Sequence, residues 1–170
     1  MFSLFNTLSS YLIYFLTFVP KNNKIIYLAT SSQGIYKSSD KGETWQNLKD
    51  NYKNYNGANI YRNLIFDFTK NDALLYASNY GLLKSPDGGK NWQEIKLLTP
   101  PNSIAIRSLA INPYESNQIY YATNIAFYRT FDGGQTWLTS SLPSPRIANY
   151  LLVDPVTTNV IYMGMSQPRK

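Results

Sequence analysis

One octapeptide pattern occurs three times in this chain of 170 residues, at almost constant spacing. The copies occupy residues 38–45, 85–92 and 130–137, and each has Ser or Thr first, Asp third, Gly fifth and Trp last. The final tryptophans stand 47 and 45 residues apart. A repeat of that length matches one four-stranded blade of a β-propeller, in which successive sheets surround a central channel.

The segments between the octapeptides repeat as well. A Tyr-containing apolar run precedes each octapeptide and occurs a fourth time near the C-terminus, at residues 25–30, 74–78, 119–123 and 160–164. Short β-rich runs separated by Asn, Asp, Pro and Gly predict strands, and no segment has a sustained helical period. The expected fold is therefore all-β, a partial β-propeller of about three and a half four-stranded blades. The expected blades are residues 12–50, 60–98 and 104–142, with a half blade at 147–170.

The residue types of the octapeptide suit the hairpin between the third and fourth strands of a blade. Asp accepts hydrogen bonds from N–H groups of its own turn, Gly supplies a positive φ, and Trp anchors the hairpin by burying a large ring. We therefore expect a structural role for Asp40, Gly42, Trp45, Asp87, Gly89, Trp92, Asp132, Gly134 and Trp137.

The octapeptide resembles the Asp-box, or BNR repeat, of sialidases, sortilin-type receptors, family-74 xyloglucanases and photosystem II assembly-factor-like proteins. The longer unit is most similar to the assembly-factor and xyloglucanase group, and the resemblance covers nearly all of residues 12–170. Lys41 stands where the repeat usually has Gly, and Asn91 where it usually has Thr. The resemblance implies box aspartates that are structural and, in the assembly-factor-like group, an arginine-rich patch that binds a partner polypeptide.

Three and a half blades do not close a ring, and an open ring leaves edge strands unpaired. Three interpretations follow. The chain is part of a larger propeller, or a partner or a second copy completes the ring as in a homodimer, or the blades form an open stack with protected edges.

The N-terminal residues 1–19 carry no charged side chain and end in an apolar run before Pro20. One interpretation is a leader or membrane anchor, with residues 1–11 as an apolar segment outside the propeller, which favours export or the cell envelope. The other is that residues 14–19 form the first strand of the first blade, which leaves a cytoplasmic location open. Membrane association is expected only through residues 1–19.

The composition excludes several kinds of chemistry. The chain has no Cys and no His, which excludes disulfides, thiol catalysis and a Ser-His-Asp triad and removes the commonest metal ligands. We expect no metal and no cofactor. The net charge of +6 reflects 16 Lys and Arg against 10 Asp and Glu, and the lysines are scattered, so no specific nucleic-acid partner is expected.

The acidic residues do not form a catalytic pair. Glu43, Glu94 and Glu115 fall in turns or near the outer strands, whereas a glycosidase needs two carboxylates that flank one bond. We expect no catalytic residue and no enzymatic activity in this chain. The alternative is a carbohydrate-active propeller, glycoside hydrolase or sialidase-like, whose catalytic acids lie outside these residues.

Three arginines form the candidate binding site. Arg62 and Arg107 each precede a leucine by two and lie 14 residues before the aligned tyrosine, whereas Arg146 lies 16 before its own. First strands line the channel of a propeller, so these side chains are expected to converge on one anionic group, which Arg binds through a bidentate fork. The alternative is that these arginines have no binding role, and that each begins a strand and is solvated or paired with a neighbouring turn.

Other repeated residues are expected to be structural. The basic residues Lys37, Lys84 and Arg129 are expected to pair locally beside the hairpins. The aligned tyrosines Tyr27, Tyr76, Tyr121 and Tyr162 are expected in the core. A second candidate surface is the Asn-rich loop 47–63, whose tyrosines Tyr52, Tyr55 and Tyr61 are freer to contact a ligand, either a polypeptide or a glycan.

Overall fold

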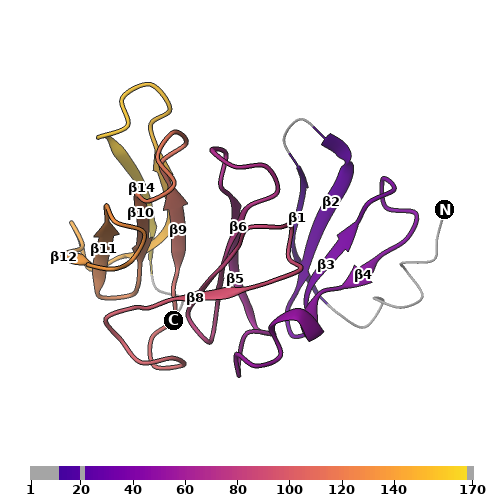
Figure 1. The fold of residues 1–170 in the computed structure, drawn as a ribbon. Helices are drawn as coiled ribbons and strands as arrows, with labels where there is room; N and C mark the ends of the chain where they lie inside the picture. The colour runs from indigo at the N-terminus through magenta and orange to yellow at the C-terminus, as the bar shows by residue number, and fades with distance from the viewer. Residues whose placement is uncertain (1–11, 20–21, 168–170) are drawn as a thin grey trace.

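The structure, a computed structural model, describes residues 12–19 and 22–167. The strands form three four-stranded antiparallel sheets and one two-stranded sheet, and within each sheet they lie in chain order (Figure 1). Successive sheets stand next to one another from the N-terminal to the C-terminal end of the described chain (Figure 1). The expected all-β partial propeller is confirmed.

The blades have these bounds. The first contains β1 (Ile13–Val19), β2 (Asn22–Thr30), β3 (Gly34–Ser38) and β4 (Gln46–Asn47), followed by the short 3-10 helix η1 (Lys49–Tyr52). The second contains β5 (Tyr61–Phe66), β6 (Leu74–Ser78), β7 (Leu82–Ser85) and β8 (Gln93–Ile95). The third contains β9 (Ser108–Ile111), β10 (Ile119–Ala122), β11 (Ala126–Thr130) and β12 (Leu138–Ser141). The fourth sheet pairs β13 (Ile147–Val153) with β14 (Ile161–Ser166).

The N-terminal apolar run is part of the first blade. Ile13–Val19 forms β1 and pairs antiparallel with β2, as the strand interpretation expects. The expected apolar segment 1–11 lies outside the described residues. In the described part of the chain, no helix is long and apolar enough to cross a membrane.

The octapeptides set the register of the blades. Their first residues pair with equivalent residues of the second strands: Ser38 with Ile26, Ser85 with Leu74, and Thr130 with Ile119. Counting from these pairs puts Tyr27 and Tyr120 at one position of the blade, and Tyr76 and Tyr121 at the next. The expected alignment of Tyr27 with Tyr76 and Tyr121 is therefore wrong by one residue. The second strands carry tyrosine at two adjacent positions, and the blades differ in which of the two is used.

The hydrophobic core lies between neighbouring blades. It includes Tyr27, Leu64 and Trp92 between the first and second blades, Leu75, Ile95 and Tyr121 between the second and third, and Ala110, Tyr120 and Val153 between the third and fourth. Tyr27, Tyr76 and Tyr121 are buried, as expected. Tyr162 is 53% exposed, so its expected place in the core is wrong: β14 is the last described strand, and no described strand covers its outer face.

The octapeptide turns repeat one set of hydrogen bonds. In the first, the Ser38 hydroxyl donates to Asp40 Oδ1 at 2.7 Å and accepts from the Gly42 N–H at 2.8 Å, while Asp40 accepts from the N–H and the hydroxyl of Thr44. These bonds, above all the one from the Thr44 hydroxyl, lower the pKa of Asp40 to about 2. The aspartates are thus held ionised as acceptors within their own turns.

The three tryptophans do not all bond in the same way. The indole N–H groups of Trp45 and Trp92 donate to the carbonyl of their own octapeptide's glycine, at 2.9 and 3.0 Å. The indole of Trp137 donates instead to the carbonyl of Lys96, at 2.8 Å, in the linker after β8. The third tryptophan therefore connects its hairpin to the preceding blade.

Of the basic residues beside the hairpins, Lys84 and Arg129 contact groups of their own blades, as expected, whereas Lys37 bonds to the octapeptide turn of the second blade, so the local pairing expected for it is wrong. The partners are the Gly88 carbonyl for Lys37 at 3.3 Å, the Asp67 carboxylate for Lys84 at 3.5 Å, and the Phe131 ring for Arg129 at 5.9 Å. Each of these side chains is thus occupied close to a hairpin, and the three do not form a shared binding stripe.

The Asn-rich loop is packed rather than free. Tyr52 is only 2% exposed, and its hydroxyl accepts from the Ile35 N–H at 3.0 Å. Tyr55 donates to the Trp92 carbonyl at 3.1 Å and packs against Tyr80, with ring centroids 5.0 Å apart. The expectation that Tyr52 and Tyr55 face a ligand is wrong, because Tyr52 holds the loop to β3 of the first blade and Tyr55 holds it to the second blade.

Candidate functional site

A bulge in the first strand aims Arg62 out of its sheet. Along β5 and β6, Tyr61 pairs with Ser78 and Asn63 with Ala77, which leaves Arg62 as an extra residue without a partner. Such a bulge redirects a side chain and sharpens the local twist. The arginine is therefore placed by a backbone irregularity rather than by the regular alternation of the strand.

The same position of the third blade holds Arg107. Ser108 pairs with Ala122 as Asn63 does in the second blade, and Arg107 directly precedes it. The main-chain N–H of Arg107 donates to the Ala122 carbonyl at 2.8 Å. The equivalence of Arg62 and Arg107 expected from their spacing is thus present in the register of the strands.

The first and fourth blades carry other residues there. The pairing of β1 with β2 skips Tyr14, and the pairing of β13 with β14 skips Asn149. We call this location the bulge position, and its occupants along the chain are Tyr14, Arg62, Arg107 and Asn149. Arg146 lies three residues before Asn149, so the expected third arginine is out of register.

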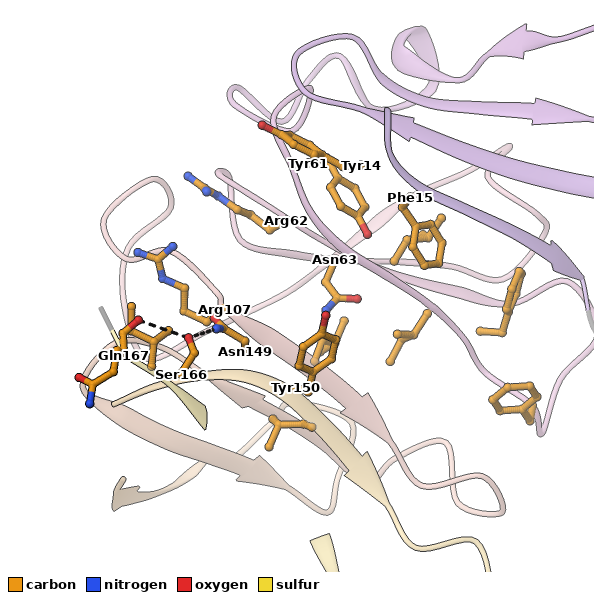
Figure 2. Close-up of a pocket in the computed structure, with 17 residues that line it drawn as sticks. Tyr14, Phe15, Tyr61, Arg62, Asn63, Arg107, Asn149, Tyr150, Ser166 and Gln167 are labelled. Atoms are coloured by element: carbon orange, nitrogen blue, oxygen red, sulfur yellow. Dashed lines mark hydrogen bonds between the residues drawn. The ribbon is translucent and has the colours of Figure 1, made fainter. Parts of the chain in front are cut away.

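A cavity of about 1020 Å³ opens along the four first strands, and all four bulge-position residues line it. Arg62 and Arg107 extend in the same direction from neighbouring strands, with Asn149 on the next strand (Figure 2). Arg146 is exposed and does not line the cavity, which corrects the expectation that it converges with the other two. Of the described residues that line this cavity, none is Asp or Glu.

Each bulge-position arginine is held by an asparagine. Arg62 Nε donates to Asn79 Oδ1 at 2.8 Å, and Arg107 Nε donates to Asn124 Oδ1 at 2.6 Å. In the fourth blade the Asn149 amide donates to the Ser166 hydroxyl (Figure 2). In all three cases the partner lies 17 residues further along the chain, just after the second strand for Asn79 and Asn124 and at its last residue for Ser166.

The arginines keep an unbalanced positive charge. Within residues 12–19 and 22–167 the one ion pair joins Lys84 to Asp67, neither of which lines this cavity. Because neither arginine has a carboxylate partner there, their Nη groups can serve a ligand from outside. The cavity can therefore bind an anion, and the same charge repels a cationic ligand.

Aromatic rings of the first and second blades form a second wall of the cavity, next to Arg62 (Figure 2). Tyr61 stacks on Phe15, with centroids 6.0 Å apart, and on Tyr14 at 6.4 Å (Figure 2). Burial raises the pKa of Tyr61, so its hydroxyl is neutral at physiological pH. Tyr61 is the one tyrosine of the expected loop surface that reaches the cavity. This wall suits an apolar or aromatic group.

Candidate metal ligands do not gather in the described part of the chain. Among the described residues, no three His, Cys, Asp or Glu side chains gather closely enough to hold a metal ion. Asp67 is buried at the end of β5, where it accepts from the Thr69 hydroxyl at 2.6 Å and pairs with Lys84. The lining of the cavity supplies hydrogen-bonding groups, positive charge and aromatic rings.

Comparison with known proteins identifies the fold class. No family model matches the chain, and no curated protein matches its sequence. Similar solved structures are the GH74 enzyme of Niastella koreensis (19% identity, TM-score 0.68), YCF48 from Cyanidioschyzon merolae (25%, 0.56) and YCF48 bound to D1 peptide (20%, 0.59). They cover 90%, 78% and 86% of this chain.

These similar structures are β-propellers, and the chain is a partial β-propeller of the same architecture. It spans 26% of the GH74 enzyme and 38% and 46% of the two YCF48 chains. The set contains both enzymes and YCF48, so the shared fold identifies the class of protein and leaves its activity to the site.

Proposed function

We propose that the chain is a non-catalytic interaction scaffold with blades of the Asp-box type, which binds an acidic polypeptide in the channel cavity through Arg62 and Arg107. The observation that carries the proposal is the pair of arginines at one register position of neighbouring blades, without a carboxylate partner among the described residues. A scaffold of this kind needs anchoring groups and no catalytic acid.

The chemistry of the two walls favours a polypeptide ligand. Arginine binds carboxylate through parallel N–H···O bonds, which are stronger than neutral hydrogen bonds. The stacked rings of Tyr14, Phe15 and Tyr61 offer an apolar surface beside that charge. An acidic residue next to an apolar one would use both walls. A propeller bound to a peptide, YCF48 with a D1 peptide, is among the similar structures and supports this kind of ligand.

The second candidate is a glycan, for which the aromatic wall is the supporting observation. Sugars stack on aromatic rings, and the similar GH74 enzyme is a carbohydrate-active propeller. On this alternative the chain belongs to a carbohydrate-active propeller whose catalytic acids lie outside it, since no carboxylate lines the cavity in the part of the chain that the structure describes.

The test is the affinity of a short peptide that alternates acidic and apolar residues, measured by fluorescence anisotropy at low salt. Arg62→Gln and Arg107→Gln should each weaken binding by about tenfold to a hundredfold, because each removes a charge-assisted contact worth about 1.5–3 kcal/mol. Arg146→Gln is the matched control, since it removes the same charge from a residue outside the cavity.

The peptide and the glycan candidates predict different effects of these variants on binding. Equal affinities for the wild type, Arg62→Gln and Arg107→Gln would refute the peptide site, as would an equal loss with Arg146→Gln. A peptide with its acids replaced by amides should not bind. Binding of a xyloglucan oligosaccharide that is lost with Tyr61→Ala and kept with both arginine variants would favour the glycan instead.

A further inference from the structure

We propose that Asn79 and Asn124 are positioning residues of the channel cavity, which hold Arg62 and Arg107 so that each offers only its terminal Nη edge to a carboxylate. The inference rests on the proposed function and adds a second pair of residues and a binding geometry to it. Neither asparagine lines the cavity, so both act through the arginine that they contact.

The hydrogen bonds define which edge of each guanidinium is engaged. A guanidinium can bind a carboxylate side-on, through Nε and one Nη, or end-on, through both Nη groups. In both arginines Nε already donates to an asparagine Oδ1, at 2.8 Å for Arg62 and 2.6 Å for Arg107. The side-on edge is therefore occupied, and the end-on edge remains for the ligand.

The polar contact between the bulge-position side chain and a residue further along the chain recurs in successive blades, which indicates that it is a regular part of the fold. The spacing of 17 residues is the same in the second, third and fourth blades. In the second blade the main-chain N–H of Asn79 donates separately to the Ile60 carbonyl at 3.1 Å, so the side chain is not needed for the backbone there. The side chain of Asn79 is thus available for Arg62.

An asparagine fits this role better than an acid would. Its carbonyl oxygen accepts from Nε without neutralising the guanidinium, so the full positive charge stays available for the ligand. It also restricts a long side chain that would otherwise lose rotamer freedom on binding. The pair of contacts therefore combines orientation with retained charge, which selects an anionic group with two coplanar oxygens.

The first measurement needs no ligand. In a ¹⁵N–¹H NMR spectrum of the full chain, the Nε–H signals of Arg62 and Arg107, assigned through Arg62→Gln and Arg107→Gln, should exchange slowly with water. Asn79→Ala should speed exchange of the Arg62 signal alone, and Asn124→Ala that of the Arg107 signal alone. Asn54→Ala, at an exposed asparagine of the loop, is the control and should change neither.

The second measurement is the affinity of the acidic peptide. Asn79→Ala and Asn124→Ala should each weaken binding by about three- to tenfold, as expected for ordering one freed side chain. Asn79→Asp should restore slow exchange of the Arg62 Nε–H signal and yet weaken binding further than Asn79→Ala, since its carboxylate competes with the ligand for the guanidinium. A merely structural asparagine would not separate these two readouts.

The outcomes distinguish this inference from the proposed function. Peptide binding that is lost in Arg62→Gln and unchanged in Asn79→Ala and Asn124→Ala would overturn the positioning role and leave the peptide site intact. Unchanged Nε–H exchange in both alanine variants would overturn it as well. Failure of the wild type to bind the peptide would overturn the proposed function, and with it the carboxylate geometry proposed for the asparagines.

Discussion

Replacing the fifth residue of each octapeptide by alanine gives a graded test of the packing between blades. Gly42, Gly89 and Gly134 have φ angles of 93°, 86° and 96°, in the region that an L side chain rarely adopts. Each Gly→Ala change should therefore cost about 1–2 kcal/mol of unfolding free energy from backbone strain. Since the three turns have the same backbone conformation, this strain cost should be the same at all three positions.

The space around the new methyl group differs at the three positions. At Gly42 the Cβ would meet nothing closer than 3.5 Å, at Gly89 it would lie 2.6 Å from the Leu48 Cδ1 atom, and at Gly134 it would lie 2.3 Å from Ile95 Cγ2. A leucine Cδ1 moves with rotation of the outer side-chain bond, whereas an isoleucine Cγ2 is bonded to Cβ and moves only with χ1, which is stiff in a β-branched residue. Overpacking adds about 1–3 kcal/mol, so Gly134→Ala should cost about 2–5 kcal/mol in total.

The assay is urea unfolding followed by tryptophan fluorescence, with the change in unfolding free energy taken from the midpoints at a common slope. The expected order of cost is Gly42→Ala, then Gly89→Ala, then Gly134→Ala. Adding Ile95→Ala to Gly134→Ala should cost less than the sum of the single changes, because the clash is gone. Equal losses in all three variants would refute the steric argument, and no loss at Gly42 would refute the strain argument.

Two further predictions concern the turns and the loop. Tyr52→Phe should destabilise the chain by about 1–3 kcal/mol in the same assay, because the Ile35 N–H loses its acceptor, while Tyr114→Phe at an exposed tyrosine should be neutral; equal effects would contradict the packed loop. Hydrogen bonds, chiefly from the Thr136 and Thr44 hydroxyls, lower the pKa of Asp132 and of Asp40, the latter to about 2. The stability that these carboxylates contribute is fully present above the unfolded pKa near 4 and is lost as the pH falls towards 2. Asp132→Asn should therefore reduce the decrease of the urea midpoint between pH 4 and 2. An equally steep decrease in the variant and the wild type would contradict this.

The blade architecture could be predicted because its signals are local. Asp40, Gly42 and Trp45 act within one hairpin, and their types and spacing recur in the other two blades. The exposure of Tyr162 could not be predicted from such local signals, since it depends on whether another strand covers β14. The role of Tyr52 was also hidden, because its hydroxyl acts on Ile35, across a turn that the loop's composition does not reveal.

The site could be predicted only in part, because the sequence does not show the pairing register of the strands. Arg62 and Arg107 share a spacing to their second strands, so their equivalence was visible. Asn149 was missed because the tyrosines used for the alignment occupy two adjacent positions, and the bulge adds a residue that no sequence pattern marks. A constant separation of 17 residues between paired polar side chains could have indicated it, once the register was known.

The bulge position also bears on how such a chain can change in evolution. The hydrogen bonds between the first, third and seventh residues of each octapeptide lie within the hairpin between third and fourth strands, while the four bulge-position residues lie on or directly before the first strands. Tyr14, Arg62, Arg107 and Asn149 differ in size and charge on nearly the same backbone. Under the proposed function, a substitution at one of them would change the ligand contacts of one blade and leave the octapeptide hairpins unaltered. The cavity would then be a combinatorial surface, whose specificity is set by four separately variable positions.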